Sequence, residues 1–376
     1  MFASLGAYGH LYPMMPLALA CADAGHDVVI ATGDPFLGRL PLPTVPGFPD
    51  TMRLDWAIGE ARRRHPQLHG DEFSMAMFAD VTAEATVPTM IEQCERTRPD
   101  LVVFEGMNTG AGVAASVLGI PSAAYAIALA TAIYGALHPA TVRYRHGTWR
   151  ARHRAAPESD LLADALISPA PPSLRQGDPT SAPIIPIRSI AYNEAGADAP
   201  AWLAAPRTRP TVYLTLGTVS SVAVDVLIHA LAEIAALDVE VLVTVGPDGD
   251  PHALGDVPDN VRVERFVAQS AVLPLVDLIV HHGGTGTVLG ALEAGLPQLL
   301  LPQHADQFLN AVILTSAGAG RALIEPAADP GAIADAVRAL LGDAPERQAA
   351  ARLRDEIAVM PAPREVVPTL VQLATR

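Results

Sequence analysis

The segment DLIVHHGGTGT, from Asp277 to Thr287, decides the fold of the C-terminal half of the chain. A short apolar strand runs into a turn that contains Gly283, Gly284 and Gly286, and the residues that follow are typical of a helix. The backbone N–H groups of such a turn and of the helix N-terminus converge on one point, so the turn is suited to an anion such as a pyrophosphate. Three side chains of the segment would add hydrogen bonds to that anion: His282, Thr285 and Thr287.

Two other interpretations of these glycines remain open. Glycines by themselves can serve only to allow a tight turn. The spacing Gly284-Thr-Gly286-Thr-Val-Leu-Gly290, with Asp306 about 20 residues further on, is also compatible with the dinucleotide fingerprint of an NAD-dependent oxidoreductase. That fingerprint normally opens its domain, whereas this strand comes late in its own. Two histidines and two threonines on one turn favour the anion site.

The regions on both sides of this segment alternate between short apolar strands and helices. Such alternation predicts parallel sheets with helices on both faces. The predicted fold class is α/β, with two Rossmann-like, doubly wound domains facing each other across a cleft. The predicted strands include 2–5, 28–32, 101–104, 120–125, 211–216, 239–245, 261–266, 278–281 and 298–301, and the predicted helices include 13–24, 110–118, 222–236, 285–294 and 307–316.

A proline-rich stretch separates the two halves of the chain. Residues 168–210 hold nine prolines and show little hydrophobic periodicity, as expected for the end of one domain and a linker. The predicted organisation is an N-terminal domain at 1–195, a linker at 196–210, a C-terminal domain at 211–358, and a C-terminal helix at 359–376 that packs back on the N-terminal domain.

The composition excludes several classes of protein. The net charge of −15 argues against nucleic acid as a partner, and no apolar stretch reaches the length of about 18 residues that spans a membrane. All 25 basic residues are arginine, so lysine-dependent phosphate loops, Schiff bases and short-chain dehydrogenase chemistry are excluded. The first residues lack a secretion signal, so we expect a cytoplasmic protein. Cys21 and Cys94 lack metal-ligand spacing and are expected to be reduced core residues.

Over nearly its whole length the sequence resembles the inverting glycosyltransferases of the GT-B fold that tailor antibiotics and other natural products, with the enediyne-tailoring group as the most similar in character. The segments that carry the resemblance are SLGAYGHLYPMMPLA at 4–18, VYLTLGT at 212–218, RFVAQSAVLPLVDLIVHHGGTGT at 265–287 and GLPQLLLPQHADQFLNA at 295–311. The resemblance implies transfer of a sugar from a nucleoside diphosphate to a hydroxyl of an apolar small molecule, without a metal ion or a cofactor.

The resemblance also implies roles for residues on the donor side. His282 matches the histidine that contacts the donor phosphate, and the glycine-rich turn with Thr287 matches the other phosphate contacts. Gly217 and Thr218 match a second phosphate-facing turn. The remaining matches are Phe266, which would stack on the pyrimidine, Val267, whose backbone would contact its edge, and Asp306 and Gln307, which would bind the hydroxyls of the donor sugar.

One departure from the family pattern bears on the donor. Relatives that use UDP-glucose place a glutamate eight residues after the phosphate histidine, where it binds the ribose hydroxyls, and here that position is Gly290. Glu293 lies three residues out of register. A ribose that lacks the 2′-hydroxyl would not need the carboxylate, so the sequence favours a dTDP-sugar over a UDP-sugar.

The catalytic side of the predicted site is GHLYP, which contains His10. This histidine follows a glycine turn at the end of the first strand, and imidazole titrates in the range that suits a general base. A lone histidine at a helix start is more often a cap, but the resemblance implies that His10 is the base. The family aspartate that orients the base corresponds to Glu105, whose other interpretation is a solvated strand end.

The acceptor is expected in the N-terminal domain, where segments 52–80 and 125–150 carry Met52, Trp56, Met75, Met77, Phe78, Tyr134 and Trp149. Ordinary core packing is the alternative for each of them.

Asp248-Gly-Asp250 is interpreted as a loop and Arg62–Arg64 as a solvated helix face. Two rival functions remain: a UDP-sugar-dependent transferase of primary or cell-wall metabolism, and a noncatalytic auxiliary that binds sugar nucleotides. The sequence leaves open whether the protein forms a homodimer.

Overall fold

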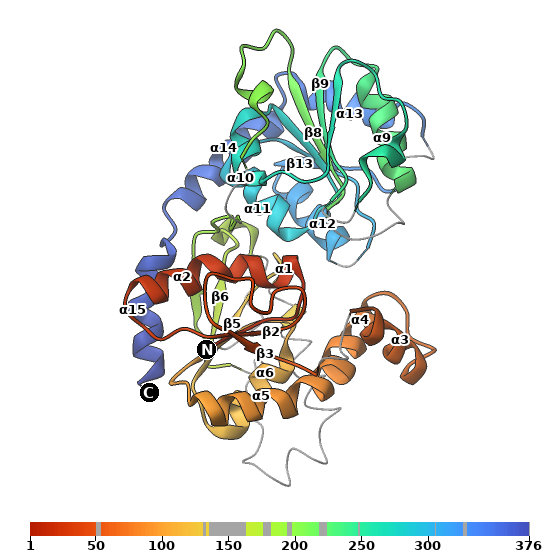
Figure 1. The fold of residues 1–376 in the computed structure, drawn as a ribbon. Coiled ribbons are helices and arrows are strands. Elements are labelled where there is room, and N and C mark those ends of the chain that lie inside the picture. The colour runs from red at the N-terminus through yellow and green to blue at the C-terminus, as the bar shows by residue number, and fades with distance from the viewer. Residues whose placement is uncertain are drawn as a thin grey trace. The chain divides into compact units, whose positions relative to one another are not determined.

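The computed structural model describes residues 1–49, 54–130, 133–134, 163–175, 182–193, 198–217, 224–246, 249–304, 306–325 and 329–375. The chain forms two compact units (Figure 1). The N-terminal unit contains Met1–Ala170, Arg175–Arg188 and Met360–Arg376, and the C-terminal unit contains Pro171–Leu174 and Ser189–Val359. The domain limits proposed from the sequence, with a linker at 196–210, stay a prediction, because compactness alone defines these two units.

The sheet of the N-terminal unit has seven parallel strands in the order β3-β2-β1-β4-β5-β6-β7. The strands are β1 Phe2–Ala3, β2 Ile30–Thr32, β3 Thr44–Pro46, β4 Val102–Glu105, β5 Ser122–Tyr125, β6 Ala165–Ser168 and β7 Ile184–Pro186. The direction of winding reverses between β1 and β4, whose register pairs Ala3 with Phe104. In open α/β sheets ligands bind at the carboxyl ends of the strands at such a switch point. His10 follows β1 and Glu105 ends β4, so both residues lie there.

The helices of the N-terminal unit include a long interrupted one over the sheet. Its parts are α4 Gly70–Ala76, a six-residue π-turn Met77–Thr82, and α5 Ala83–Thr97. Near the N-terminus, α2 Met15–Asp23 lies beside the last helix of the chain, α15 Pro363–Ala374 (Figure 1). The others are α1 Tyr8–Leu11, a 3₁₀ turn at Tyr12–Met14, α3 Leu54–Arg64 and α6 Thr109–Leu118.

The sheet of the C-terminal unit has six parallel strands in the order β10-β9-β8-β11-β12-β13. They are β8 Thr211–Thr215, β9 Glu240–Thr244, β10 Val261–Glu264, β11 Leu278–His281, β12 Gln298–Leu300 and β13 Gly320–Ala322. The switch point lies between β8 and β11, where Thr215 pairs with His281. The turns that follow these two strands, which carry Gly217 and His282, therefore lie at the same edge of the sheet.

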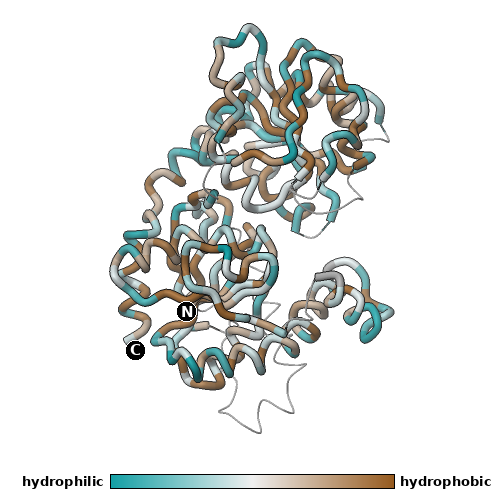
Figure 2. Tube along the Cα trace, viewed as in Figure 1, coloured by the Kyte–Doolittle hydropathy of each residue, from teal (hydrophilic) through white to brown (hydrophobic). Residues whose placement is uncertain are grey.

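The helices of the C-terminal unit are α9 Val224–Ala235, α10 Gln269–Val272, α11 Thr285–Glu293, α12 Gln307–Ser316, α13 Ala332–Leu341 and α14 Pro345–Ala358. The main core lies between the sheet and helices α9 and α13, where side chains such as Val241, Val280, Leu231 and Val337 are buried. Figure 2 shows hydrophobic residues along the strands of each unit and hydrophilic residues toward the end of α3. Burial of both sheet faces explains why these strands are nearly continuous apolar runs.

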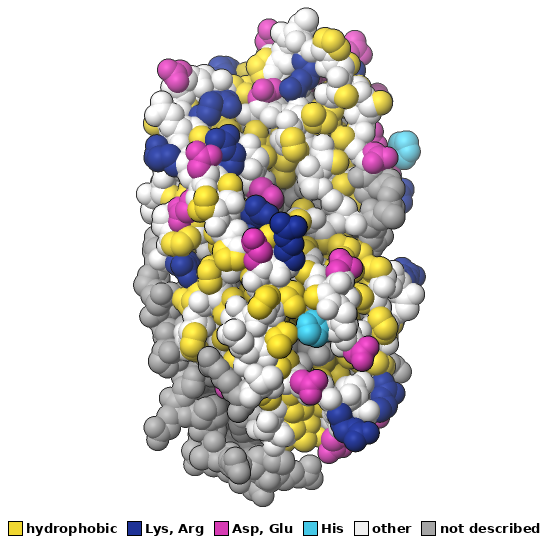
Figure 3. Space-filling view, turned by 90° about the vertical axis from the view of Figure 1, so that its left-hand side faces the viewer, with side chains coloured by type: hydrophobic (Ala, Val, Ile, Leu, Met, Phe, Trp, Pro, Cys, Tyr) yellow, Lys and Arg dark blue, Asp and Glu magenta, His cyan; other side chains and the backbone are white. Residues whose placement is uncertain are grey.

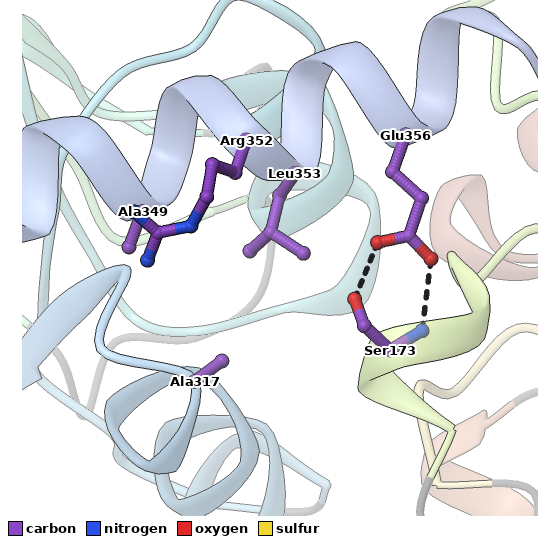
Figure 4. Close-up of a pocket in the computed structure, with 6 residues that line it drawn as sticks. All are labelled: Ser173, Ala317, Ala349, Arg352, Leu353 and Glu356. Atoms are coloured by element: carbon purple, nitrogen blue, oxygen red, sulfur yellow. Dashed lines mark hydrogen bonds between the residues drawn. The ribbon is translucent and has the colours of Figure 1, made fainter.

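A short segment from the middle of the chain belongs to the C-terminal unit because it binds α14. The carboxylate of Glu356 accepts hydrogen bonds from the backbone N–H of Ser173, at 2.9 Å, and from its hydroxyl (Figure 4). These residues line a cavity of about 300 Å³ together with Ala317, Ala349, Arg352 and Leu353. The contact joins residues 171–174 to a helix far along the sequence.

The surface carries charges of both signs. On the face shown in Figure 3, basic side chains lie interspersed with acidic and apolar ones. Of the helices in the described parts of the chain, none has both the length and the apolar character needed to cross a membrane.

Candidate active site

The glycine-rich turn between β11 and α11 is built around the imidazole of His282. A Cβ atom on Gly217 would lie 2.7 Å from Cε1 of His282, and one on Gly284 would lie 2.5 Å from its Nε2. Real Cβ atoms do not approach so closely, so both positions need glycine while the imidazole lies between the two turns. Gly217 also has φ +86°, a backbone conformation that favours glycine.

The helix that follows the turn presents its N-terminus at the same place. Gly284 is the N-cap of α11, with extended backbone, and nine helical residues follow it. The N–H groups of the first helical turn have no acceptor within the helix, so they carry the positive end of the helix dipole. The turn and the helix together form an anion site of the kind that binds phosphate groups.

Both histidines of the turn are neutral at neutral pH. Burial lowers the pKa of His282 to about 4, with a smaller contribution from the charge of His304. Burial lowers the pKa of His281 to about 3, helped by His282 and opposed by a hydrogen bond to Gln298. His282 would therefore act on a phosphate as a neutral N–H donor. Its Nδ1 is buried without a hydrogen-bond partner among the described residues.

These two pKa values predict a loss of stability in acid. In the unfolded chain histidine has a pKa of about 6.5. Below that pH the unfolded state binds protons that the folded state does not bind, because the folded-state pKa values are lower. The free energy of unfolding should therefore fall as the pH drops from about 6.5 toward the folded pKa values, by up to about 1.4 kcal/mol per pH unit for each imidazole. Urea unfolding at several pH values measures this slope. The account fails if His281→Asn, which removes one of the two groups, has the same slope as wild type.

His281 is fully buried and binds the turn through hydrogen bonds. The backbone N–H of Gly283 donates to Nδ1 of His281 at 3.0 Å, and Nε2 of His281 lies 2.9 Å from Oε1 of Gln298. Because a backbone N–H can only donate, the proton of the imidazole is on Nε2. The N–H of Gly283 is thus used inside the protein. A contact between Gly283 and the donor stays a prediction.

The structure brings Asp306 next to the turn. The hydroxyl of Thr285 donates to Oδ2 of Asp306 at 2.9 Å, and Nδ2 of Asn310 lies 2.9 Å from the same oxygen. The sequence analysis did not identify Asn310. Its position four residues after Asp306 in a predicted helix could have indicated it, because side chains four residues apart on a helix are neighbours. The Gln307 side chain folds back, because its Oε1 accepts from the backbone N–H groups of Gln303, at 2.8 Å, and His304.

The residues predicted to hold the nucleoside base lie after β10. Phe266 is a large aromatic side chain that is 52% exposed, whereas Val267 is buried. An exposed aromatic face at the carboxyl end of a strand suits stacking on a base. Thr218, the other predicted phosphate contact, lies outside the described residues.

In the N-terminal unit the structure joins His10 to Glu105. Nδ1 of His10 lies 3.0 Å from Oε1 of Glu105; the His10 side chain is 22% exposed and the Glu105 side chain 0%. The other carboxylate oxygen accepts from the backbone N–H of Met107 at 2.8 Å. Glu105 is therefore a buried, fixed carboxylate and not a solvated strand end. With the proton on Nδ1, Nε2 of the neutral ring carries the lone pair that a general base needs.

An aromatic ring lies beside the base. The ring centroid of Phe78, in the π-turn, lies 6.1 Å from that of His10. Tyr8 and Tyr12, two residues before and after His10 in the sequence, contact each other and Phe36, with ring centroids 5.0 to 5.7 Å apart. Such π-turns inside helices are frequent at functional sites.

The other residues predicted for the acceptor divide into two groups. Trp56 is exposed and Met75 is partly buried. Met77 and Tyr134 are core residues, and the Tyr134 hydroxyl accepts from the backbone N–H groups of Ile127 and Ala128. Packing therefore explains Tyr134, which lies against Gly106 with no room for a Cβ.

Met52 and Trp149 lie outside the described residues, as does Asp248. Among the residues that are described, no three His, Cys, Asp or Glu side chains form a group suited to a metal ion.

Two doubly wound parallel sheets, one with a histidine–carboxylate pair and the other with an anion-binding turn at its switch point, define a glycosyltransferase of the GT-B fold. The similarity to solved structures confirms this class. SnogD from Streptomyces nogalater, a glycosyltransferase, is 30% identical with a TM-score of 0.82, over 99% of this chain and 98% of that one.

The chain belongs to the erythromycin biosynthesis protein CIII-like family. The model of its N-terminal domain matches residues 19–217 and that of its C-terminal domain matches residues 228–373. The L-demethylnoviosyl transferase of Streptomyces niveus is 35% identical over 97% of this chain and 96% of its own length. The spinosyn rhamnosyltransferase SpnG, solved with thymidine diphosphate, is 28% identical with a TM-score of 0.79, over 98% of this chain and 99% of that one. SpnG is also solved with spinosyn aglycone.

Proposed function

We propose that this protein transfers a hexose-derived deoxysugar from a dTDP-sugar to a hydroxyl of an apolar natural-product aglycone, in antibiotic biosynthesis, with inversion and without a metal ion. The observation that carries the proposal is the pair formed by His10 and the buried carboxylate of Glu105 at the switch point of the N-terminal sheet. A noncatalytic auxiliary would not need this pair. A cytoplasmic location stays a prediction.

His10 acts as the general base in this proposal. A sugar-accepting hydroxyl is a weak nucleophile, so removal of its proton in the transition state accelerates the attack on the anomeric carbon. Glu105 fixes the ring and its tautomer through Nδ1 and stabilises the imidazolium that forms. The carboxylate is held by the backbone N–H of Met107, so it does not need to reorganise during the reaction.

The C-terminal unit stabilises the departing diphosphate. The N–H groups of the first turn of α11 and a neutral N–H of His282 meet the phosphate oxygens, where negative charge increases as the anomeric bond breaks. These groups replace the metal ion that other glycosyltransferases use. Displacement by the hydroxyl from the opposite face inverts the anomeric carbon.

The proposed position of the acceptor is supported by the aromatic ring of Phe78 beside His10. Phe78 is held beside the base by the π-turn, and the hydroxyl of Thr109 donates to its carbonyl oxygen at 3.2 Å. An apolar wall beside an imidazole suits a hydroxyl attached to an apolar skeleton. The complex of the relative SpnG with spinosyn aglycone supports this assignment.

The preference for dTDP over UDP is tested at Gly290, on α11. The glutamate that binds the 2′- and 3′-hydroxyls in UDP-glucose enzymes is replaced here by glycine. The ribose of UDP therefore makes no hydrogen bond to a carboxylate at this position. Gly290→Glu should therefore improve UDP binding relative to dTDP, by about 1–3 kcal/mol. A Cβ at this position would meet only Cδ1 of Leu273, at 3.2 Å, so a small rotation of a flexible side chain accommodates it.

The measurement is a set of four calorimetric titrations, with dTDP and UDP into wild type and Gly290→Glu. Gly290→Ala is the matched control, because it adds the same Cβ without a carboxylate. An unchanged ratio of the two affinities in Gly290→Glu would show that this position does not read the ribose. The rival UDP-sugar transferase would then become the better assignment.

A further inference from the structure

Two side chains beneath the anion-binding turn have no role in the mechanism above, yet both are 0% exposed. Asn310 is the fourth residue of α12, and His281 is the last residue of β11. Each makes hydrogen bonds to the turn at 2.9–3.0 Å. Buried polar side chains with several well-formed hydrogen bonds fix the local structure around them. These two residues therefore fix the position of the anion-binding turn.

Asn310 joins three separate groups of the donor site. Its Nδ2 lies 2.9 Å from the carbonyl oxygen of Gly283, from the hydroxyl of Thr285 and from Oδ2 of Asp306. The carbonyl and the carboxylate can only accept, so the NH₂ group must face them. Aspartate could not take this position, because it would bring a second carboxylate to Asp306 without a donor.

The orientation of Asn310 has an energetic consequence. Its Oδ1 is buried with no hydrogen-bond partner among the described residues. An unsatisfied buried acceptor destabilises the fold. The side chain is therefore better explained by what its NH₂ group positions than by a contribution to overall stability.

His281 fixes the other end of the same turn. It connects the backbone N–H of Gly283 to Gln298 on β12, and Nε2 of Gln298 donates to the carbonyl of Val288 on α11 at 3.3 Å. The N–H of Gly283 is thus held by His281 and its carbonyl by Asn310. The turn is tied to the sheet on one side and to α12 on the other.

We propose that Asn310 and His281 are positioning residues for the donor: they hold the phosphate-binding turn and the carboxylate of Asp306 as one preformed unit. The inference rests on the proposed function, because it assigns the turn to the diphosphate and Asp306 to the donor sugar. It explains why the Gly283 N–H donates to His281 and the Thr285 hydroxyl donates to Asp306. The Thr285 hydroxyl serves instead to connect the turn to Asp306.

The first test removes the NH₂ group of Asn310. Asn310→Leu keeps the approximate volume, and we expect it to weaken binding of both dTDP and dTDP-glucose by about 10-fold to 100-fold, because a small displacement of a binding group has that effect. Asn310→Asp should weaken both further. The affinity for the acceptor should not change, which separates a donor-positioning role from a general loss of structure.

Asn260 provides a matched control in the same unit. Its Nδ2 donates to the carbonyl oxygens of Ala235, at 3.1 Å, and Val239, at 3.0 Å, far from the turn in the sheet order. Asn260→Leu loses a comparable pair of hydrogen bonds and should lower the melting temperature. It should leave the affinity for dTDP within about threefold of wild type.

A second pair of variants keeps the inference falsifiable if Asn310→Leu does not fold. His281→Asn retains an acceptor near the N–H of Gly283, whereas His281→Leu removes it. We expect His281→Asn to recover most of the dTDP affinity that His281→Leu loses. The inference is overturned if Asn310→Leu or His281→Leu folds and still binds dTDP and dTDP-glucose as tightly as the wild-type protein does. Failure of the proposed function looks different, because the wild-type protein would then bind neither nucleotide.

Discussion

His10→Ala should lower kcat by about 10²-fold to 10⁴-fold, the range typical of a lost general base. The affinity for dTDP should stay close to wild type, because the anion-binding turn belongs to the other compact unit. Glu105→Gln should reduce kcat to a similar degree. It keeps the shape of the side chain but removes the carboxylate that holds the proton on Nδ1 of His10.

The same unit offers a control with equivalent chemistry. His65, which directly follows α3, and Asp80, in the π-turn, form a second histidine–carboxylate pair, with Nε2 and Oδ2 3.1 Å apart. His65→Ala breaks a hydrogen-bonded histidine–carboxylate pair without changing His10. It should retain most of the wild-type kcat. Steady-state rates with a saturating donor measure all three variants, and more than a tenth of the wild-type rate in His10→Ala would remove this residue from the mechanism.

Gly284→Ala should abolish most of the donor affinity. The new Cβ would lie 2.5 Å from Nε2 of His282, so the imidazole has to leave its place between the two turns. Gly217→Ala meets the same ring at 2.7 Å and adds a backbone conflict at φ +86°. Displacement of a phosphate donor on this scale should weaken dTDP binding by about 10²-fold.

Gly342→Ala is the control for both glycine variants. Gly342 ends α13 with φ −75°, and the nearest atom to a Cβ there would be the carbonyl oxygen of Ala339 at 3.4 Å, an ordinary contact. Its dTDP affinity should equal that of wild type. If Gly284→Ala binds dTDP as tightly as Gly342→Ala does, then His282 is not held where the structure places it, or it does not contact the diphosphate.

Local signals predicted the elements around the donor site well. The strand predicted at 278–281 is β11, and the helix predicted at 285–294 is α11, one residue shorter. Both depend on nearby features, namely an apolar run, a glycine turn and a helix start. The helix predicted at 13–24 is instead a 3₁₀ turn followed by α2, and the strand predicted at 2–5 ends at Ala3. These differences lie at element ends, where local signals are weakest.

The hydrogen bonds that hold the donor turn could not be predicted from the sequence, although the pairing of His10 with Glu105 was predicted. The sequence analysis assigned the phosphate contact to His282 and no role to His281, and only the fold shows that Nδ1 of His281 accepts a hydrogen bond from the backbone N–H of Gly283. Nor does any periodicity reveal the π-turn at 77–82, because the apolar pattern of the helix continues through it. The family resemblance located Asp306, but the network that holds its carboxylate involves Asn310. That network depends on side-chain positions in three elements.

The most direct test of the central claim is a calorimetric titration of the wild-type protein with dTDP and with UDP in the presence of EDTA. The claim is that a helix N-terminus and a neutral histidine bind the diphosphate of a thymidine donor without a metal ion. The account predicts that dTDP binds under these conditions, more tightly than UDP by about 1–3 kcal/mol. Binding of dTDP that is lost in EDTA and restored by a divalent cation, or UDP binding that is equal or tighter, would contradict it.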